Sequence, residues 1–307
     1  CRWSCATGSP TRSVSGCPAR SYSTARRLPS WPGGCVASSP STSSRPRRPR
    51  PGSPATPVGK VYFDAVRAGK VDEGWELLKA IALTRPLFEA PAELEELPEP
   101  VTLADGPAGP RLICISSPVS VGGAHQYARI AAHFRGDRGV QALPLVGFAA
   151  GESLPGSAQA ITRAVAESVL HAGDGNPFVL VGHSSGGALA LAVAGLLESM
   201  WGVRADGVIM LDTLSLRHEH GDSVDYRQLA RRFMGETGSA TVTVDSNRLS
   251  AMAHYLNRMS ALEVPPTTAP TLLVRCSVPL LGDPDASVEH GQQELLVPAE
   301  TVRTIDA

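Results

Sequence analysis

The sequence predicts an α/β fold, in which a mostly parallel sheet carries helices on both faces. Short apolar runs rich in β-branched residues alternate with longer helical patterns between residues 111 and 275, and this alternation is typical of a parallel sheet. The hydrophobic share of 42% in 307 residues is enough for one sizeable domain. The stretch from Asn176 to Met200 joins a strand pattern to a helical pattern through a glycine-rich turn.

Residues 1–58 differ in composition from the rest of the chain. They contain nine Arg and no Asp, Glu or Lys, a charge of +9; the whole chain carries −1, so the remainder carries −10. Ser, Pro, Arg and Gly dominate without an amphipathic period, which predicts a disordered linker. The alternatives are a basic arm for nucleic acid or a membrane surface, or a segment foreign to the native protein.

The folded part is expected to span residues 59–307, and its acidic balance argues against a nucleic-acid partner. No apolar run approaches the roughly 20 residues that span a bilayer, so we expect no membrane partner and a cytoplasmic location. Two cysteines of this part, Cys114 and Cys276, fall in apolar runs and are predicted to be buried thiols. The other four show no C-x-x-C repeat, and no metal site is predicted.

Two helices are predicted ahead of the sheet, within residues 59–88. The second begins at Asp72 as its N-cap and ends before Pro86. Their apolar faces either pack on their own domain or pair with a second copy of the chain. Residues 90–110, rich in Glu and Pro, are predicted to form a connector.

The remaining elements follow the alternating pattern. A final segment, 295–305, is expected to return towards the sheet, and residues 214–269 read as a helical insertion that would cover the site as a lid. Strands are expected at 111–115, 140–145, 178–181, 207–211 and 271–275, and helices at 125–134, 158–172, 187–197, 226–234 and 248–259.

The turn after the third strand has the sequence Gly182-His183-Ser184-Ser185-Gly186. G-x-S-x-G between a strand and a helix is the pattern of a nucleophile elbow, in which Ser184 is the nucleophile and the Ser185 N–H donates to an oxyanion. The alternative is a glycine-rich turn between core elements. His183 is interpreted as structural or substrate-lining, because a catalytic base comes from a distant segment.

Asp212 follows the strand at 207–211, so a right-handed strand–helix–strand unit places it near Ser184. A carboxylate there can orient a histidine; the alternative is that Asp212 only caps a loop. The histidine itself is not evident. His254 lies in the lid and His290 in a loop, and we expect the base just beyond Ala307.

Several ordered segments carry a family resemblance: AGKVDEGWELLKAIALTRPLF, VTLADGPAGPRLICISS, NPFVLVGHSSGGALA, GVIMLDT and APTLLVR. Residues 58–307 resemble the C-terminal thioesterase domains of type I modular polyketide synthases, which have the α/β-hydrolase fold. The resemblance implies an acyl–Ser184 intermediate with Asp212 as the triad acid, and a homodimer formed through the paired N-terminal helices. It also implies that the substrate is carried on the phosphopantetheine of an acyl carrier protein, with no cofactor bound directly.

The resemblance places the second oxyanion donor at Pro118, which has no N–H. Either the Val119 N–H donates instead, or the oxyanion hole rests on Ser185 alone. Losing one donor costs about 2.7–4 kcal/mol of transition-state stabilisation, so slow acyl turnover is expected.

The function predicted is release of a polyketide chain by hydrolysis or macrolactonisation, with a weak preference for hydrolysis. Two alternatives stay open: a stand-alone editing thioesterase or esterase of the same fold, and an inactive fragment that binds acyl chains or dimerises.

Overall fold

A computed structural model describes residues 57–213, 245–276 and 301–305. The predicted linker, apart from its last two residues, therefore lies outside the described residues. So do the expected helix at 226–234 and His290.

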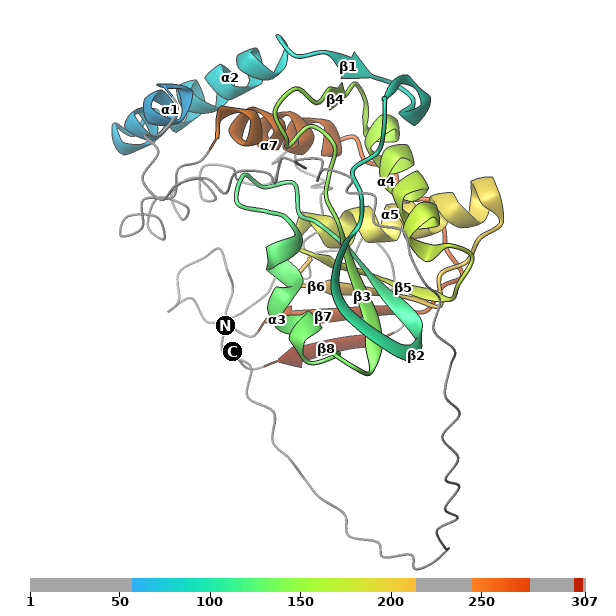
Figure 1. The fold of residues 1–307 in the computed structure, drawn as a ribbon. Helices are drawn as coiled ribbons and strands as arrows, with labels where there is room; N and C mark the ends of the chain where they lie inside the picture. Colours follow the sequence, from blue (N-terminus) through green and yellow to red (C-terminus); the bar gives the residue numbers. More distant parts are fainter. Residues whose placement is uncertain (1–56, 214–244, 277–300, 306–307) are drawn as a thin grey trace, which may run out of the picture. The chain divides into compact units, whose positions relative to one another are not determined.

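The described strands form a six-stranded sheet in the order β3-β2-β5-β6-β7-β8, and neighbouring strands are parallel except where the first half of β2 meets β3 (Figure 1). The mostly parallel sheet predicted from the alternating pattern is confirmed. A separate two-stranded parallel sheet pairs β1 (Leu87–Phe88) with β4 (Leu154–Pro155). The strands of the large sheet are β2 (Val101–Ile115), β3 (Arg138–Leu143), β5 (Phe178–His183), β6 (Gly207–Leu211), β7 (Thr271–Cys276) and β8 (Thr301–Ile305).

Strand β2 begins earlier than the sequence predicts. The expected connector at 90–110 holds a short 3-10 helix, η1 (Pro91–Glu93), and then the first ten residues of β2. Both halves of β2 pair with β3, the first in reverse order (Val101 with Ala142) and the second in parallel (Leu112 with Val140), with register shifts between them. Pairing with a distant strand decides this conformation, and local composition does not reveal it.

Helices lie on both faces of the sheet, as alternate residues of β2 show. Ile113 and Ile115 pack in one core cluster with α4 (Ala158–Gly173) and α5 (Ser185–Trp201). Leu112 and Cys114 pack in another with Tyr127, at the end of η2 (Ala124–Tyr127), and with α3 (Ala128–Ala132). The buried thiol predicted at Cys114 is confirmed, with burial raising its pKa to about 12. The side chain of Cys276 is not described.

Three helices form a smaller cluster beside the sheet: α1 (Pro57–Arg67), α2 (Val71–Ala82) and α7 (Ser246–Met259) (Figure 1). Tyr62, Trp75 and Leu78 of the first two are buried with Leu249 and Met252 of α7. The N-terminal helices therefore pack on their own domain; pairing with a second copy stays a prediction.

The predicted N-cap of α2 at Asp72 is wrong. Lys70 holds that position, and Asp72 lies in the first turn of the helix. Gly69, with φ of +76°, turns the chain so sharply that the second helix starts at Val71.

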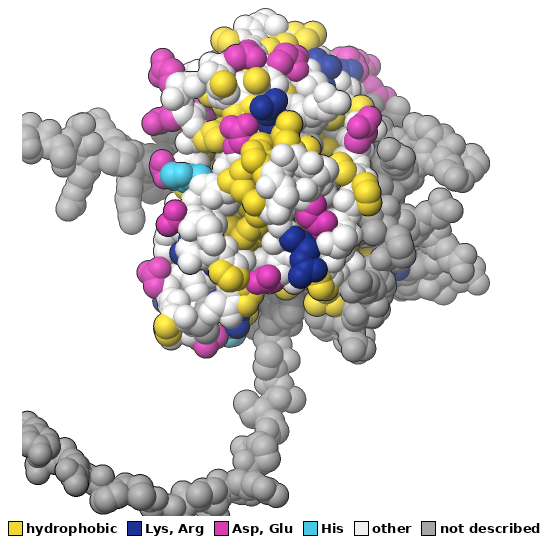
Figure 2. All heavy atoms as spheres, turned by 90° about the vertical axis from the view of Figure 1, so that its right-hand side faces the viewer, with side chains coloured by type: hydrophobic (Ala, Val, Ile, Leu, Met, Phe, Trp, Pro, Cys, Tyr) yellow, Lys and Arg dark blue, Asp and Glu magenta, His cyan; other side chains and the backbone are white. Residues whose placement is uncertain are grey.

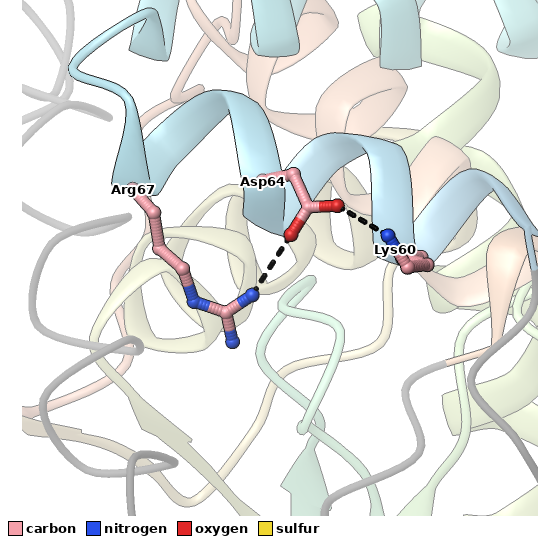
Figure 3. A network of polar contacts seen from close by, with 3 residues as sticks. All are labelled: Lys60, Asp64 and Arg67. Atoms are coloured by element: carbon pink, nitrogen blue, oxygen red, sulfur yellow. Dashed lines mark hydrogen bonds and ion pairs between the residues drawn. The ribbon is translucent and has the colours of Figure 1, made fainter.

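The solvent face of α1 carries a small ion-pair network (Figure 3). Asp64 accepts hydrogen bonds from Lys60 at 2.7 Å and from Arg67 at 3.0 Å. The Lys60 bond is the main cause that lowers the pKa of Asp64. Exposed pairs at this spacing add little to stability, so the burial of Tyr62 and Val66 fixes this helix.

Figure 2 shows the face on the right-hand side of Figure 1, where a band of hydrophobic side chains runs between acidic ones. Large apolar side chains that stay exposed on the described surface include Val61 and Leu83. No helix among the described residues is both long and apolar enough to cross a membrane.

Candidate active site

Ser184 lies at the turn between β5 and α5, at the carboxyl edge of the sheet. Its φ of 52° and ψ of −129° are rare for a residue other than glycine, and such backbone strain clusters at functional sites. The Ser184 N–H donates to the Leu211 carbonyl at 2.8 Å, and its carbonyl accepts from the Gly187 N–H at 2.9 Å. The backbone of the expected nucleophile is therefore tied to strand β6 and to its own helix.

Glycines make this turn possible. A Cβ on Gly182 would lie 2.2 Å from the Gly186 carbonyl oxygen, and one on Gly186 would lie 2.7 Å from the carbonyl oxygen of Ile115. The positions two before and two after Ser184 are therefore too crowded for a side chain. A third glycine, Gly187, was not singled out from the sequence, yet a Cβ there would lie 1.9 Å from Thr213 Oγ1.

Asp212 follows β6 directly, also with a positive φ, of 47°. His183 and Leu211 are register partners in β5 and β6, so Ser184 and Asp212 are the next residues along two adjacent strands. The Asp212 N–H donates to the Val274 carbonyl at 2.7 Å, and Thr213 Oγ1 donates to the Ser184 carbonyl at 3.1 Å. The structure thus brings the two predicted residues to the same edge of the sheet, while their catalytic roles stay predictions.

Both backbone polar groups of His183, the N–H and the carbonyl, are hydrogen-bonded to side-chain hydroxyls. Its N–H donates to the Tyr127 hydroxyl at 3.1 Å, and its carbonyl accepts from Ser117 Oγ at 2.5 Å. Burial lowers the pKa of the imidazole, and the nearby charge of Asp212 acts in the opposite direction. Burial thus favours the neutral ring.

The expected oxyanion donors come from the start of α5 and from the loop after β2. Ser185 is the first residue of α5, so its N–H is one of the four that a helix leaves without an internal partner. Pro118 is buried and has no N–H. The Val119 N–H donates to the Ser117 carbonyl at 2.8 Å, and the Ser117 N–H donates to Gln126 Oε1 at 3.1 Å. In this arrangement Ser185 is the predicted donor whose N–H points out of the helix end.

Arg248 of α7 also contacts the loop after β2, and no sequence pattern predicted this contact. Its Nε donates to the Ser120 carbonyl at 2.6 Å, and its Nη2 donates to the carbonyl of Gly122. The guanidinium carbon lies 5.3 Å from the centre of the Phe148 ring. Burial lowers the pKa of this arginine. A cation this far along the chain is brought to the loop by tertiary packing alone.

His254, the lid histidine set aside as a base, is buried in α7 with 4% of its surface exposed. Its Nε2 lies 2.6 Å from the Pro155 carbonyl oxygen, and burial is the main cause that lowers its pKa. Among the described residues, no three His, Cys, Asp or Glu side chains are grouped to hold a metal ion.

Comparison with known proteins gives a consistent result. The family model described as "Thioesterase domain" matches residues 110–283. The Spectinabilin polyketide synthase system protein NorC of Streptomyces orinoci is 36% identical over 236 residues, covering 75% of this chain and 10% of that protein. Polyketide synthase GfsE of Streptomyces halstedii is 38% identical over 239 residues, covering 75% of this chain and 6% of that protein. The chain therefore spans about a tenth or less of these relatives.

Solved structures agree on the fold. The Vlm2 thioesterase domain superposes with a TM-score of 0.50 at 19% identity, covering 68% of this chain and 88% of that one. The NocB thioesterase domain superposes with a TM-score of 0.51 at 16% identity, covering 65% of this chain and 84% of that one. At this identity the likeness shows the fold alone, which is of the α/β-hydrolase type.

Proposed function

The chain belongs to the thioesterase family, and on that premise we propose that it releases a polyketide chain from an acyl carrier protein through an ester on Ser184. The observation that supports the proposal most strongly is the backbone of Ser184, held at φ 52° beside Asp212 on the neighbouring strand. The polyketide synthase relatives support the class of acyl chain and the carrier-bound donor.

The first half of the reaction transfers the acyl group to the protein. Ser184 Oγ attacks the thioester carbonyl carbon, its proton passes to a general base, and the phosphopantetheine sulfur leaves as the thiol. The Ser185 N–H stabilises the negative charge on the carbonyl oxygen. Asp212 orients the base, for which we expect a histidine outside the described residues.

The second half frees the acyl group. Water attacks the Ser184 ester and gives a linear acid, or a hydroxyl of the chain attacks and gives a macrolactone; we favour hydrolysis. Pro118 lacks an N–H and the Val119 N–H is engaged by the Ser117 carbonyl, and this supports an oxyanion hole with Ser185 as its donor. This supports slow acyl turnover.

A fluorophosphonate probe tests the nucleophile, because it labels only an activated serine hydroxyl. In a protein that also contains the expected histidine base, we expect labelling at Ser184, its loss in Ser184→Ala, and a strong reduction in Asp212→Asn. Ser199→Ala is the matched control, since the Ser199 hydroxyl donates to the Gly195 carbonyl at 2.9 Å within the same helix. Labelling at another serine, or equal labelling of Ser184→Ala, would contradict the proposal.

The acyl donor is tested separately, by comparing the rate of acyl transfer from a carrier-bound thioester with the rate from a free ester of the same acid. Faster transfer from the carrier-bound thioester is expected. A preference for the free ester would instead indicate a stand-alone esterase. Size-exclusion chromatography with light scattering tests the predicted homodimer.

A further inference from the structure

Arg85 joins three segments that lie far apart in the chain. It follows helix α2, and its Nη1 donates to the Asn247 carbonyl at 3.1 Å, in the first turn of α7. Its Nη2 donates to the carbonyls of Gly147 and Glu152, at 2.6 and 2.8 Å, in the loop after β3. The contacts of one half-buried guanidinium therefore hold the start of α7 against that loop.

The loop after β3 is closed on itself, and it carries an aromatic ring to Arg248. Glu152 Oε2 accepts from the Gly147 N–H at 2.6 Å. Phe148 lies between these two residues in the chain, and its ring centre is 5.3 Å from the guanidinium carbon of Arg248. A cation over an aromatic ring is attracted by the ring's quadrupole. Arg85 thus holds two neighbours of Arg248, the helix turn that carries it and the loop that carries the ring.

Arg248 extends this constraint to the loop after β2, residues 116–123. Its Nε donates to the Ser120 carbonyl at 2.6 Å, and its Nη2 donates to the carbonyl of Gly122. The Gly122 N–H donates to the Val119 carbonyl at 2.7 Å, so the same turn carries the residue expected as an alternative oxyanion donor. A guanidinium makes two such contacts with a fixed geometry. The position of this loop therefore depends on the position of the first turn of α7.

The loop after β2 contacts both the nucleophile elbow and the helix cluster beside the sheet. The Ser117 hydroxyl donates to the His183 carbonyl at 2.5 Å, and a Cβ on Gly186 would lie 3.3 Å from the Ser117 N and Oγ atoms. Further along the loop, Val119 packs against the apolar cluster formed by α1, α2 and α7. A shift of α7 would therefore be felt next to Ser184.

We propose that Arg85 is a positioning residue for acyl transfer, which acts through Arg248 on the loop after β2. Arg85 fixes the first turn of α7, and Arg248 on that turn fixes the loop beside the elbow. The inference rests on the proposed function, because the loop bears on the reaction only if an oxyanion forms next to Ser184. It makes the segment that follows the N-terminal helices part of the apparatus for acyl transfer.

Hydrogen exchange tests the positioning without turnover. Arg85→Lys keeps the charge, but one ammonium does not reproduce the planar fork that reaches three carbonyls. We expect the Val119 and Gly122 amides, which donate within the loop, to exchange about 3- to 10-fold faster in this variant. The amides of α4, which lies away from these contacts, should exchange at the wild-type rate.

Fluorophosphonate labelling tests the consequence for Ser184, in a protein that also contains the expected histidine base. In Arg85→Lys we expect the maximal labelling rate to fall about 3- to 10-fold, with the half-saturating probe concentration unchanged, because Arg85 affects the reaction and not the binding of the probe. Arg138→Lys is the matched control, since Arg138 is also half-buried and donates to the Pro110 carbonyl at 2.9 Å. Both labelling constants should keep their wild-type values in this control.

A double-mutant cycle tests whether Arg85 acts through Arg248. Arg85→Lys combined with Arg248→Lys should label about as slowly as Arg248→Lys alone, because the contact that transmits the constraint is already lost. A double variant in which the two single effects multiply would show that the two arginines act independently, and would overturn the proposal.

Wild-type exchange of the two loop amides in Arg85→Lys would also overturn the proposal, as would a wild-type maximal labelling rate. Equally faster exchange in α4 would do the same, because it would indicate a general loss of stability. If Arg85→Lys does not fold, Arg85→Gln takes its place in the same measurements. Absence of Ser184 labelling in the wild-type protein would instead overturn the proposed function, whatever the exchange of the loop amides shows.

Discussion

The hydroxyl of Tyr127 accepts a hydrogen bond from the His183 N–H at 3.1 Å and donates one to the Ile115 carbonyl at 2.5 Å. The last register pair of β2 and β5 is Ile115 with Gly182. Tyr127 therefore bridges the two strands where their own pairing ends, one residue before Ser184. Its ring is 1% exposed, and burial raises the pKa of the hydroxyl, so it stays neutral and available as both donor and acceptor.

Tyr127→Phe should remove this bridge and leave two buried backbone groups without a partner. We expect the free energy of unfolding to fall by about 1–3 kcal/mol and fluorophosphonate labelling of Ser184 to slow. Tyr255→Phe is the control, since the buried Tyr255 hydroxyl donates to the Val146 carbonyl at 2.8 Å, away from the elbow. It should lower stability and leave labelling unchanged. Equal labelling rates for Tyr127→Phe and the wild type would show that the bridge does not position the elbow.

Gly182→Ala should disrupt the elbow, because its Cβ would lie 2.2 Å from the backbone oxygen of Gly186. Overlap with backbone cannot be relieved by a rotamer change, so chemical denaturation should show a loss of more than about 3 kcal/mol. Gly207→Ala is the matched strand control, since its nearest neighbour would be 3.5 Å away. Gly207→Ala should change the free energy of unfolding by no more than about 1 kcal/mol. A similar loss for both variants would refute the argument from crowding.

Arg248→Lys should loosen the loop that carries Pro118 and Val119, because lysine keeps the charge but not the two-pronged contact with Ser120 and Gly122. We expect labelling of Ser184 to slow about tenfold, equivalent to about 1.4 kcal/mol. Arg138→Lys serves as the control, since Arg138 donates to the Pro110 carbonyl at 2.9 Å, before the second half of β2. In Arg138→Lys, labelling of Ser184 should proceed at the wild-type rate. An unchanged rate in Arg248→Lys would exclude the positioning role.

His254 should make stability depend on pH. Its pKa is lowered from the ordinary 6.5 by burial, so below pH 6.5 the unfolded chain binds more protons than the folded one. The free energy of unfolding therefore falls as the pH drops below 6.5, by at most about 1.4 kcal/mol per pH unit for one proton, and is fully retained above it.

His254→Gln checks this prediction, because glutamine keeps a donor for Pro155 but does not titrate. Urea unfolding at pH 5 to 8 should show a shallower decline below pH 6.5 than in the wild type. The remaining decline is expected from His183, whose pKa burial also lowers. An identical decline in the variant and the wild type would mean that His254 is not the titrating group.

Much of the fold followed from local patterns. The strands and helices around Ser184 were predicted within a few residues of their observed bounds, because apolar periodicity and the G-x-S-x-G turn act over short distances. The first half of β2 was not predicted, because its conformation depends on pairing with β3. The start of α2 was not predicted either, because it depends on the turn at Gly69. Asp212 was predicted from its place at a strand end, and the structure sets it beside Ser184.

The sequence by itself determined the class of fold and the expected nucleophile, because patterns of neighbouring residues indicate both. Only the tertiary structure revealed the contacts of Tyr127 and Arg248. Tyr127 reaches a partner 56 residues away and Arg248 one 128 residues away. Such contacts depend on how distant segments pack, and no local pattern encodes them.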